Sequence, residues 1–215
     1  MFKITPIALT LFITTAINIA VSYSSWQRRK SKGGMFFALG MAAVTLWTLA
    51  AGLGYSAVPL NLKIVFAKMD AVGYNSALPL FVLFAIRYTG LDNWYEKKWV
   101  RVLLFLIPLS NIMLITTNEL HGWVWQGFSP VKGNVVVFEH GPGFIWVAIT
   151  GYLMMFSMIA IFWMASRRGS DISQRQGRLL FYASIFPLAA NLVYLFGVKG
   201  AEGVDWSSVT FSITG

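Results

Sequence analysis

Residues 144–165 of the chain read FIWVAITGYLMMFSMIAIFWMA, an uninterrupted run of 22 residues without a charged side chain. The hydrocarbon core of a bilayer is about 30 Å thick, and a helix needs roughly 20 apolar residues to cross it. Arg167 and Arg168 follow this run almost at once. The stretch therefore predicts a transmembrane helix with a basic flank on one side of the membrane.

The same pattern recurs along the chain. Five further stretches have comparable length and apolar character, at about 4–25, 35–57, 65–87, 101–117 and 178–197. A seventh segment begins near Trp206, and its ten residues, 206–215, are too few to span a bilayer as a helix. We expect the chain to be cut within a seventh helix, although a polar stub is the alternative. The prediction is an all-α membrane protein, a single domain over residues 1–215 built as a seven-transmembrane helix bundle.

The composition supports this class and excludes others. The chain of 215 residues is 57% hydrophobic and only 12% charged, whereas soluble domains carry about 25% charged residues. A soluble enzyme is therefore excluded, and so is a disordered chain, which needs low hydrophobicity. The absence of cysteine excludes a disulfide framework, a thiolate metal site and a cysteine nucleophile.

The net charge of +9 is distributed unevenly between the connections. Segments 28–32, 87–101 and 167–178 hold twelve Lys and Arg and three acidic residues, whereas the remaining segments hold five of each. The positive-inside rule places the basic connections in the cytoplasm. We therefore expect a multi-pass protein of the inner (plasma) membrane with its N-terminus outside. The basic charge implies anionic lipid headgroups as partners, and no nucleic acid.

The longest outer connection, residues 118–143, predicts a β-hairpin. It contains two runs rich in aromatic and β-branched residues, 123–128 and 134–138, with Ser129, Pro130, Lys132 and Gly133 as turn chemistry between them. An extracellular hairpin with so much apolar surface is unstable alone in water. Two placements stay open: a lid on the helix bundle, or a Trp-rich segment at the membrane interface.

Residues that could carry catalysis are few. The two histidines, His121 and His140, both lie in the outer connection, and no metalloprotease, phosphate-loop or serine-elbow motif is present. Glu119 with His121, or Glu139 with His140, is a weak pattern for a metal site. We expect no catalytic residue, no metal and no cofactor in this segment.

Polar and aromatic residues inside the spans are costly in hydrocarbon and should face the interior of the bundle. One set falls in the outer half of the spans, where we predict a ligand cavity open to the outside and closed by the hairpin. The set consists of Trp47, Tyr55, Lys68, Asp70, Tyr74, Asn118, Trp146, Tyr152, Asn191, Tyr194 and Asp205. The same residue types also serve as interhelical hydrogen-bonding groups and as the aromatic belt, and that alternative stays open.

Several segments together resemble the N-terminal seven-transmembrane sensor region of bacterial and archaeal sensor histidine kinases. They are TLWTLAAGLGYSA (45–57), KIVFAKMDAVGYNSALPLFVLFAIRYTG (63–90), LIPLSNIMLITTNELHGWVW (106–125), RQGRLLFYASIFPLAANLVYLFG (175–197) and GVDWSSVTFSITG (203–215). The resemblance touches most of the chain. It rests on an ordered set of patterns of moderate specificity, and the incomplete seventh helix and missing kinase residues depart from the family.

The resemblance implies a receptor that detects an extracellular or membrane-borne signal. Its seventh helix would drive a C-terminal output domain, usually a histidine kinase and sometimes a diguanylate cyclase. The positions carried over from the family form a sensing layer: Lys68, Asp70, Tyr74, Asn118, His121 and Asp205.

The expected function is thus a transmembrane sensor of a two-component system. Lys68 beside an aromatic cavity suits a small, partly apolar or anionic ligand. The resemblance also implies a homodimer and a cognate response regulator reached through the output domain. The alternatives are a small transporter or channel, for which we find neither a repeat nor deep charge, a retinal receptor, which needs a lysine in the last helix, and a purely structural role.

Overall fold

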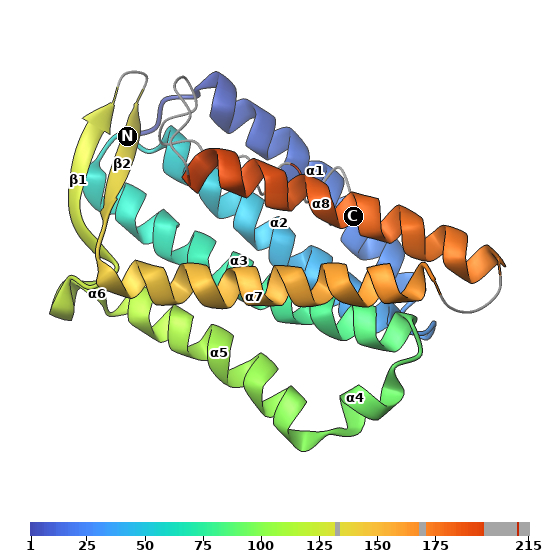
Figure 1. Ribbon diagram of the computed structural model, residues 1–215. Coiled ribbons are helices and arrows are strands. Elements are labelled where there is room, and N and C mark those ends of the chain that lie inside the picture. The colour runs from blue at the N-terminus through green and yellow to red at the C-terminus, as the bar shows by residue number, and fades with distance from the viewer. Residues whose placement is uncertain (132–133, 168–170, 196–209, 211–215) are drawn as a thin grey trace.

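The computed structural model of the chain describes residues 1–131, 134–167, 171–195 and 210, and it is mostly helical (Figure 1). Its elements are α1 (Pro6–Gln27), α2 (Gly34–Ser56), α3 (Leu60–Tyr88), α4 (Asp92–Glu96), α5 (Lys98–Thr116), α6 (Asn118–His121), β1 (Trp125–Val131), β2 (Val135–His140), α7 (Pro142–Ala165) and α8 (Asp171–Leu195). Within the described residues, five helices are long and apolar enough to cross a membrane: α1, α2, α3, α5 and α7.

The first five predicted spans match these five helices to within a few residues, except at the start of α3. We expected this span to begin near residue 65, with Lys68 and Asp70 in its first turns. The helix instead begins at Leu60, directly after Pro59 in extended backbone conformation. Likewise α8 begins at Asp171 rather than at 178. Charged residues thus extend these two helices beyond their apolar runs. The expected seventh segment lies outside the described residues, apart from Thr210.

The helix α3 lies at the centre of the bundle. It contacts α2, α5 and α7, while α1 packs against α2, and α8 against α7. Pro79 lies inside α3, and Pro108 and Pro187 lie inside α5 and α8. The main core runs along α2, α3 and α7, where Met41, Phe81 and Met158 are buried among other apolar residues.

Two close contacts join the first three helices. Between α2 and α3, a Cβ atom added to Gly73 would lie 2.6 Å from the backbone nitrogen of Trp47, a distance that real Cβ atoms do not adopt. Only glycine therefore allows the two helices to approach so closely. Between α1 and α2, the hydroxyl of Thr15 donates to that of Thr48 at 3.0 Å, inside the core.

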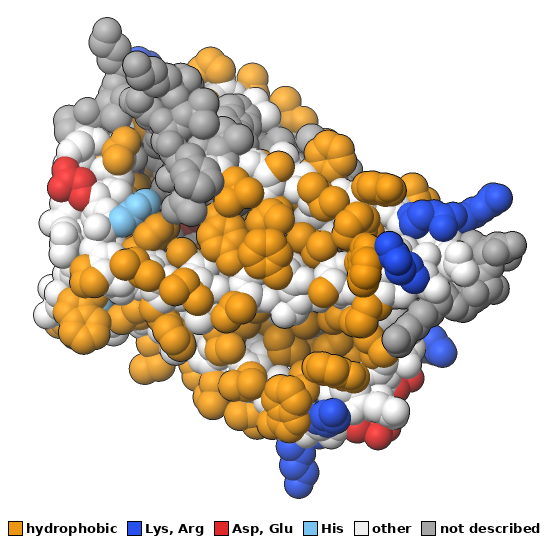
Figure 2. Space-filling view, in the orientation of Figure 1, with side chains coloured by type: hydrophobic (Ala, Val, Ile, Leu, Met, Phe, Trp, Pro, Cys, Tyr) orange, Lys and Arg blue, Asp and Glu red, His pale blue; other side chains and the backbone are white. Residues whose placement is uncertain are grey.

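The two ends of the bundle differ in charge. The N-terminus, the connection between α2 and α3, and the hairpin share one end, where Lys3 N–H donates to the Ser56 carbonyl at 2.7 Å and Val58 N–H to that of Met1 at 3.0 Å. The turn after α1, the helix α4 and the C-terminal end of α7 lie at the other end (Figure 1). In Figure 2, Lys and Arg side chains gather at this second end, beyond a broad hydrophobic band. Among the described residues, the basic side chains that the sequence grouped together thus also gather at one end of the bundle.

The predicted hairpin is confirmed, with shifted strand bounds. β1 and β2 pair antiparallel, with Trp125 opposite His140 and Phe128 opposite Phe138. Both strands end two or three residues later than expected, and residues 129 and 130, which we assigned to the turn, pair within the ladder. A proline is tolerated there because a two-stranded sheet consists only of edge strands.

Candidate functional site

A cavity of about 240 Å³ lies at the hairpin end of the bundle. Its walls come from α2, α3 and α7, with contributions from the end of α5, and five hairpin residues line it as well. Aromatic side chains dominate the lining: Trp47, Tyr55, Phe66, Tyr74, Trp125, Phe138, Phe144 and Tyr152. A concave, mostly apolar site with a few polar groups is the usual form of a small-molecule pocket, and this one is somewhat smaller than the common range of about 300–1,000 Å³.

Five members of the predicted layer line this cavity: Trp47, Tyr55, Asp70, Tyr74 and Tyr152. Trp47 and Tyr74 touch across the close contact of α2 with α3, with ring centroids 5.8 Å apart. They come together because Gly73, next to Tyr74, lets α3 approach the Trp47 backbone. The cavity therefore lies where two helices pack tightly.

The hairpin covers the cavity as a roof. Trp125 of β1 and Val136, Val137, Phe138 and His140 of β2 belong to the lining. Of the two placements left open by the sequence, this arrangement favours the lid. The described apolar side chains of the strands are half-buried, and Val135 is buried, instead of being left in water.

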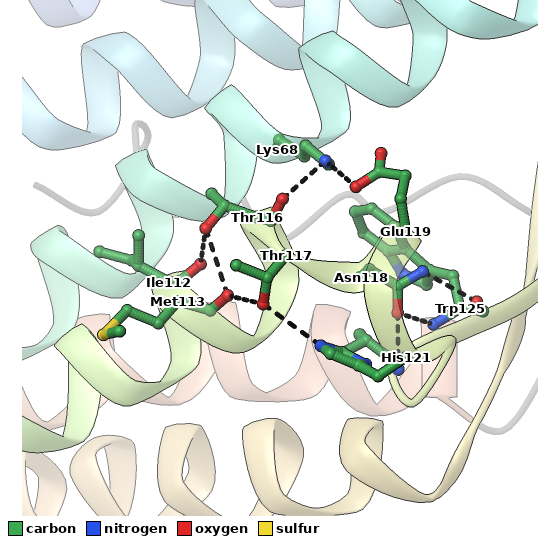
Figure 3. Close-up of polar contacts among 10 residues, drawn as sticks. Lys68, Ile112, Met113, Thr116, Thr117, Asn118, Glu119, His121 and Trp125 are labelled. Carbon is green, nitrogen blue, oxygen red and sulfur yellow. Dashed lines mark hydrogen bonds and ion pairs between the residues drawn. The ribbon is translucent and has the colours of Figure 1, made fainter.

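Two anchors hold the hairpin to the helices. At its tip, the side-chain amide of Asn134 donates to the carbonyls of Tyr55 and Ala57 at 3.2 and 3.1 Å. At its base, the Asn118 side chain accepts from the N–H groups of Val124 and Trp125 at 2.9 and 3.1 Å and donates to the Trp125 carbonyl at 2.9 Å (Figure 3). Asn118 thus positions the roof, and it is not among the residues that line the cavity.

Two basic residues of the lining were not in the predicted layer. Lys63 is buried, with 6% of its surface exposed, and His140 lies at the rim. The His140 ring stacks on Phe144 with centroids 3.6 Å apart, and burial lowers the pKa of its imidazole, which favours the neutral form near pH 7. The sequence pointed to His140 only as part of a weak metal pattern, and it grouped Lys63 with the outer connections.

Lys68, the cation we expected beside the ligand, lies elsewhere. It forms an ion pair with Glu119 and also donates to the Thr116 carbonyl at 2.7 Å (Figure 3). This pair joins α3 to the junction of α5 and α6. The hydrogen bond from Lys68 holds the pKa of the Glu119 carboxyl below its usual value. Lys68 is not part of the described cavity wall.

His121 and Trp146 also lie away from this wall. The Nδ1 atom of His121 accepts from the Trp123 N–H at 2.9 Å, and its Nε2 atom lies 3.3 Å from the Thr117 hydroxyl (Figure 3). Trp146 is about half exposed, and its indole N–H donates to Ser110 at 3.4 Å. His121 therefore orders the turn before β1, and Trp146 lies on the outer face of α7.

The remaining members of the predicted layer fall outside what the structure describes. Asn191 and Tyr194 belong to α8, but their side chains are not described, and Asp205 lies outside the described residues altogether.

A buried polar network lies beside the cavity and joins three helices. The Asn111 side chain of α5 donates to Asn75 of α3 and to Thr150 of α7, both at 2.9 Å. All three side chains are buried. Such interhelical hydrogen bonds satisfy polar groups that would otherwise face hydrocarbon, so this network has a structural role.

The described residues offer no sign of a metal centre. No group of three or more His, Asp and Glu side chains lies close enough to hold a metal ion in this part of the chain. What the site offers is an apolar, aromatic volume whose wall also carries a lysine, an aspartate and a histidine: Lys63, Asp70 and His140.

Comparison with known families gives one match. The family described as the N-terminal 7TM region of histidine kinase matches residues 10–215, which is nearly the whole chain. A search of curated proteins found no match.

Proposed function

This chain belongs to the family of N-terminal seven-transmembrane regions of histidine kinases, and from that premise we propose that it senses a small molecule and controls a C-terminal kinase. The observation that carries the proposal is the aromatic cavity roofed by the hairpin. Residues far apart in sequence, from Trp47 to Met155, meet around this volume. A ligand there would contact three helices and the hairpin at once.

The mechanism follows from linkage between binding and conformation. A ligand shifts an equilibrium only by its different affinity for two states. Occupancy of the cavity would favour one packing of α2, α3 and α7, and a seventh helix would pass this change to the output domain. We propose a complete bundle of seven spans in the inner membrane, with the N-terminus, hairpin and cavity outside. A homodimer and a response regulator acting downstream belong to the same proposal.

The proposal is tested by filling the cavity. Ala148 lines it, whereas the next residue, Ile149, is about half exposed on the surface of α7. We expect Ala148→Trp in the full-length kinase to act as a permanent occupant and to change the basal rate of autophosphorylation in membranes about fivefold, a common size for allosteric coupling.

The matched control is Ile149→Trp, which adds a tryptophan to the same helix on the lipid side. It should leave the rate close to that of the unmodified kinase. Equal rates for the unmodified kinase and both variants, at equal membrane insertion, would contradict a sensory role for the cavity.

A further inference from the structure

Lys63 is a buried cation in the cavity wall. Its ammonium group donates to two backbone carbonyls, that of Asn134 at 2.6 Å and that of Gly54 at 3.2 Å. Within the described residues, no Asp or Glu oxygen forms an ion pair with it, since the two ion pairs there involve Lys68 and Arg87. Buried charges are normally paired, because carbonyl dipoles compensate a full charge only in part. An anionic group entering the cavity would therefore find a favourable partner.

The same ammonium group holds the hairpin. Asn134 occupies the hairpin tip with a φ of 68°, so this tip adopts the left-handed conformation. Its carbonyl accepts from Lys63, while its side chain binds the end of α2. The ammonium has three N–H donors, and these two carbonyls use two of them. A ligand carboxylate binds an ammonium more strongly than a neutral carbonyl does, so it would draw Lys63 toward the cavity and weaken the bond to Asn134, one of the anchors of the roof.

The shape of the cavity indicates the rest of the ligand. Lys63, Asp70 and Tyr74 line it at helical spacing on one face of α3. At 1.5 Å per residue, Tyr74 lies about 16 Å along the axis from Lys63, and Asp70 about 10 Å. An elongated molecule would thus place its apolar body among Trp47 and Tyr74, with its acid at the Lys63 end, away from the Asp70 carboxylate.

We propose that the cavity binds an apolar monocarboxylic acid, whose carboxylate accepts hydrogen bonds from Lys63 and thereby releases the hairpin tip at Asn134. This inference rests on the sensory role proposed above and names the ligand class and the switch. It assigns to Lys63 the anion-binding role that the sequence suggested for Lys68, because Lys68 is paired with Glu119 and is not in the described wall.

The first test compares head groups on one apolar body. The probes are 4-phenylbutyrate, its amide and 4-phenylbutylamine, titrated at pH 7.5 into the full chain in lipid nanodiscs. We expect the acid to bind about tenfold more tightly than the amide, the size expected for a charge-assisted hydrogen bond, and the amine to bind more weakly still. Failure of the acid to bind, equal binding of the three, or preference for the amine would overturn the proposal.

The second test compares two lysines on the same helix. Lys63→Met should lower the affinity for 4-phenylbutyrate about tenfold, whereas Lys63→Arg should retain most of it. Lys68→Met, which removes a lysine outside the described wall, should leave the affinity unchanged. Wild-type affinity in Lys63→Met, or an equal loss in Lys68→Met, would contradict the assignment. Should Lys63→Met fail to fold, Lys63→Arg and the head-group comparison still decide the question.

The third test follows the hairpin by hydrogen exchange. Binding of 4-phenylbutyrate should increase deuterium uptake at residues 134–138, and the amide should not. Unchanged or reduced uptake with the acid bound would contradict release of the tip. The sensory role is judged separately: acid binding without any change in kinase rate would leave this inference standing and overturn the proposed function. A changed kinase rate in Ala148→Trp, together with no binding of the acid, would support the proposed function and overturn this inference.

Discussion

Single residues in this protein owe their roles to their partners more than to their type. Lys63 and Lys68 lie five positions apart on α3. Lys63 is buried at the cavity between two carbonyls, whereas Lys68 is paired with Glu119 beside the α5–α6 junction. Either lysine could be matched to an anion from the sequence, because the sequence does not show which face of α3 meets the hairpin.

The pair of Lys68 with Glu119 leads to a prediction about pH. Since the pKa of Glu119 is lower in the folded chain than its usual value, the pair stabilises the fold above that usual value, near 4.5, and the contribution is lost as the pH falls through the lowered pKa. We expect Glu119→Gln to lower the melting temperature in nanodiscs slightly at pH 6–7. The difference from wild type should shrink as the pH falls below about 4.5 and vanish once the pH lies below the lowered pKa of Glu119.

A double-mutant comparison provides the control. In a Lys68→Met background, the pH-dependent effect of Glu119→Gln on melting should be much smaller, because Lys68 is the main cause of the lowered pKa and only the backbone hydrogen bond at Glu119 and the nearby His121 remain. A Glu119→Gln effect of undiminished size in this background would assign the stabilisation to another interaction. The expected effect is small, since Glu119 is largely exposed and exposed ion pairs contribute little.

At the scale of elements, apolar run length was sufficient to place the five spanning helices. Apolar run length did not predict the start of α3, where a charged residue is buried. Lys63 lies inside this helix because the hairpin tip and the end of α2 supply hydrogen-bond acceptors for it. The bounds of β1 also differ from the expected run, 123–128, because Asn118 holds the chain at Val124 and Trp125 and so fixes where β1 begins. Both errors arise from contacts between segments distant in sequence.

Contacts between distant segments also explain why only some of the residues that line the cavity were predicted. Trp47, Asp70 and Tyr152 were found because polar or aromatic residues inside a span tend to face the interior. His140 was missed as a lining residue because it belongs to a strand whose fold over the helices depends on Asn134. The depth of a residue along a spanning helix can be estimated from the sequence. The rotation of the helix about its axis and the position of a connecting hairpin cannot.

The packing of α2 against α3 gives a prediction at this scale. Gly73→Ala would place a Cβ atom against the Trp47 backbone, so the helices would have to separate. We expect destabilisation of about 1–3 kcal/mol, the usual cost of overpacking, seen as a melting temperature several degrees lower in nanodiscs. The cavity should also change shape, since Trp47 and Tyr74 meet at this contact.

Gly151→Ala on α7 is the matched comparison. Its added Cβ would lie 3.7 Å from the Tyr74 hydroxyl, an ordinary contact, and alanine favours helix more than glycine does. The melting temperature should therefore stay equal or rise. An equal effect of the two substitutions would show that the close approach at Gly73 does not limit stability.

For the whole molecule, the two ends of the bundle have different chemistry. The hairpin, the N-terminus and the cavity share one end, and the basic turns share the other (Figures 1 and 2). Between them lies a hydrophobic band that includes Leu103, Phe105, Ile149 and Phe156, all largely exposed. Such a band suits lipid contact, and the basic end suits the anionic cytoplasmic leaflet. This arrangement separates the proposed ligand site from the proposed output by the thickness of the membrane.

The orientation can be tested with single cysteines, because the chain has none of its own. Gln126 is exposed on β1, and Ser31 is exposed in the turn between α1 and α2. We expect Gln126→Cys to react with a membrane-impermeant maleimide in intact spheroplasts, and Ser31→Cys to react only after the membrane is permeabilised. If only Ser31→Cys were labelled in intact spheroplasts, the orientation would be the opposite of the one proposed, with the cavity on the cytoplasmic side. The ligand would then have to be an intracellular compound, and the basic end would face outward against the positive-inside rule.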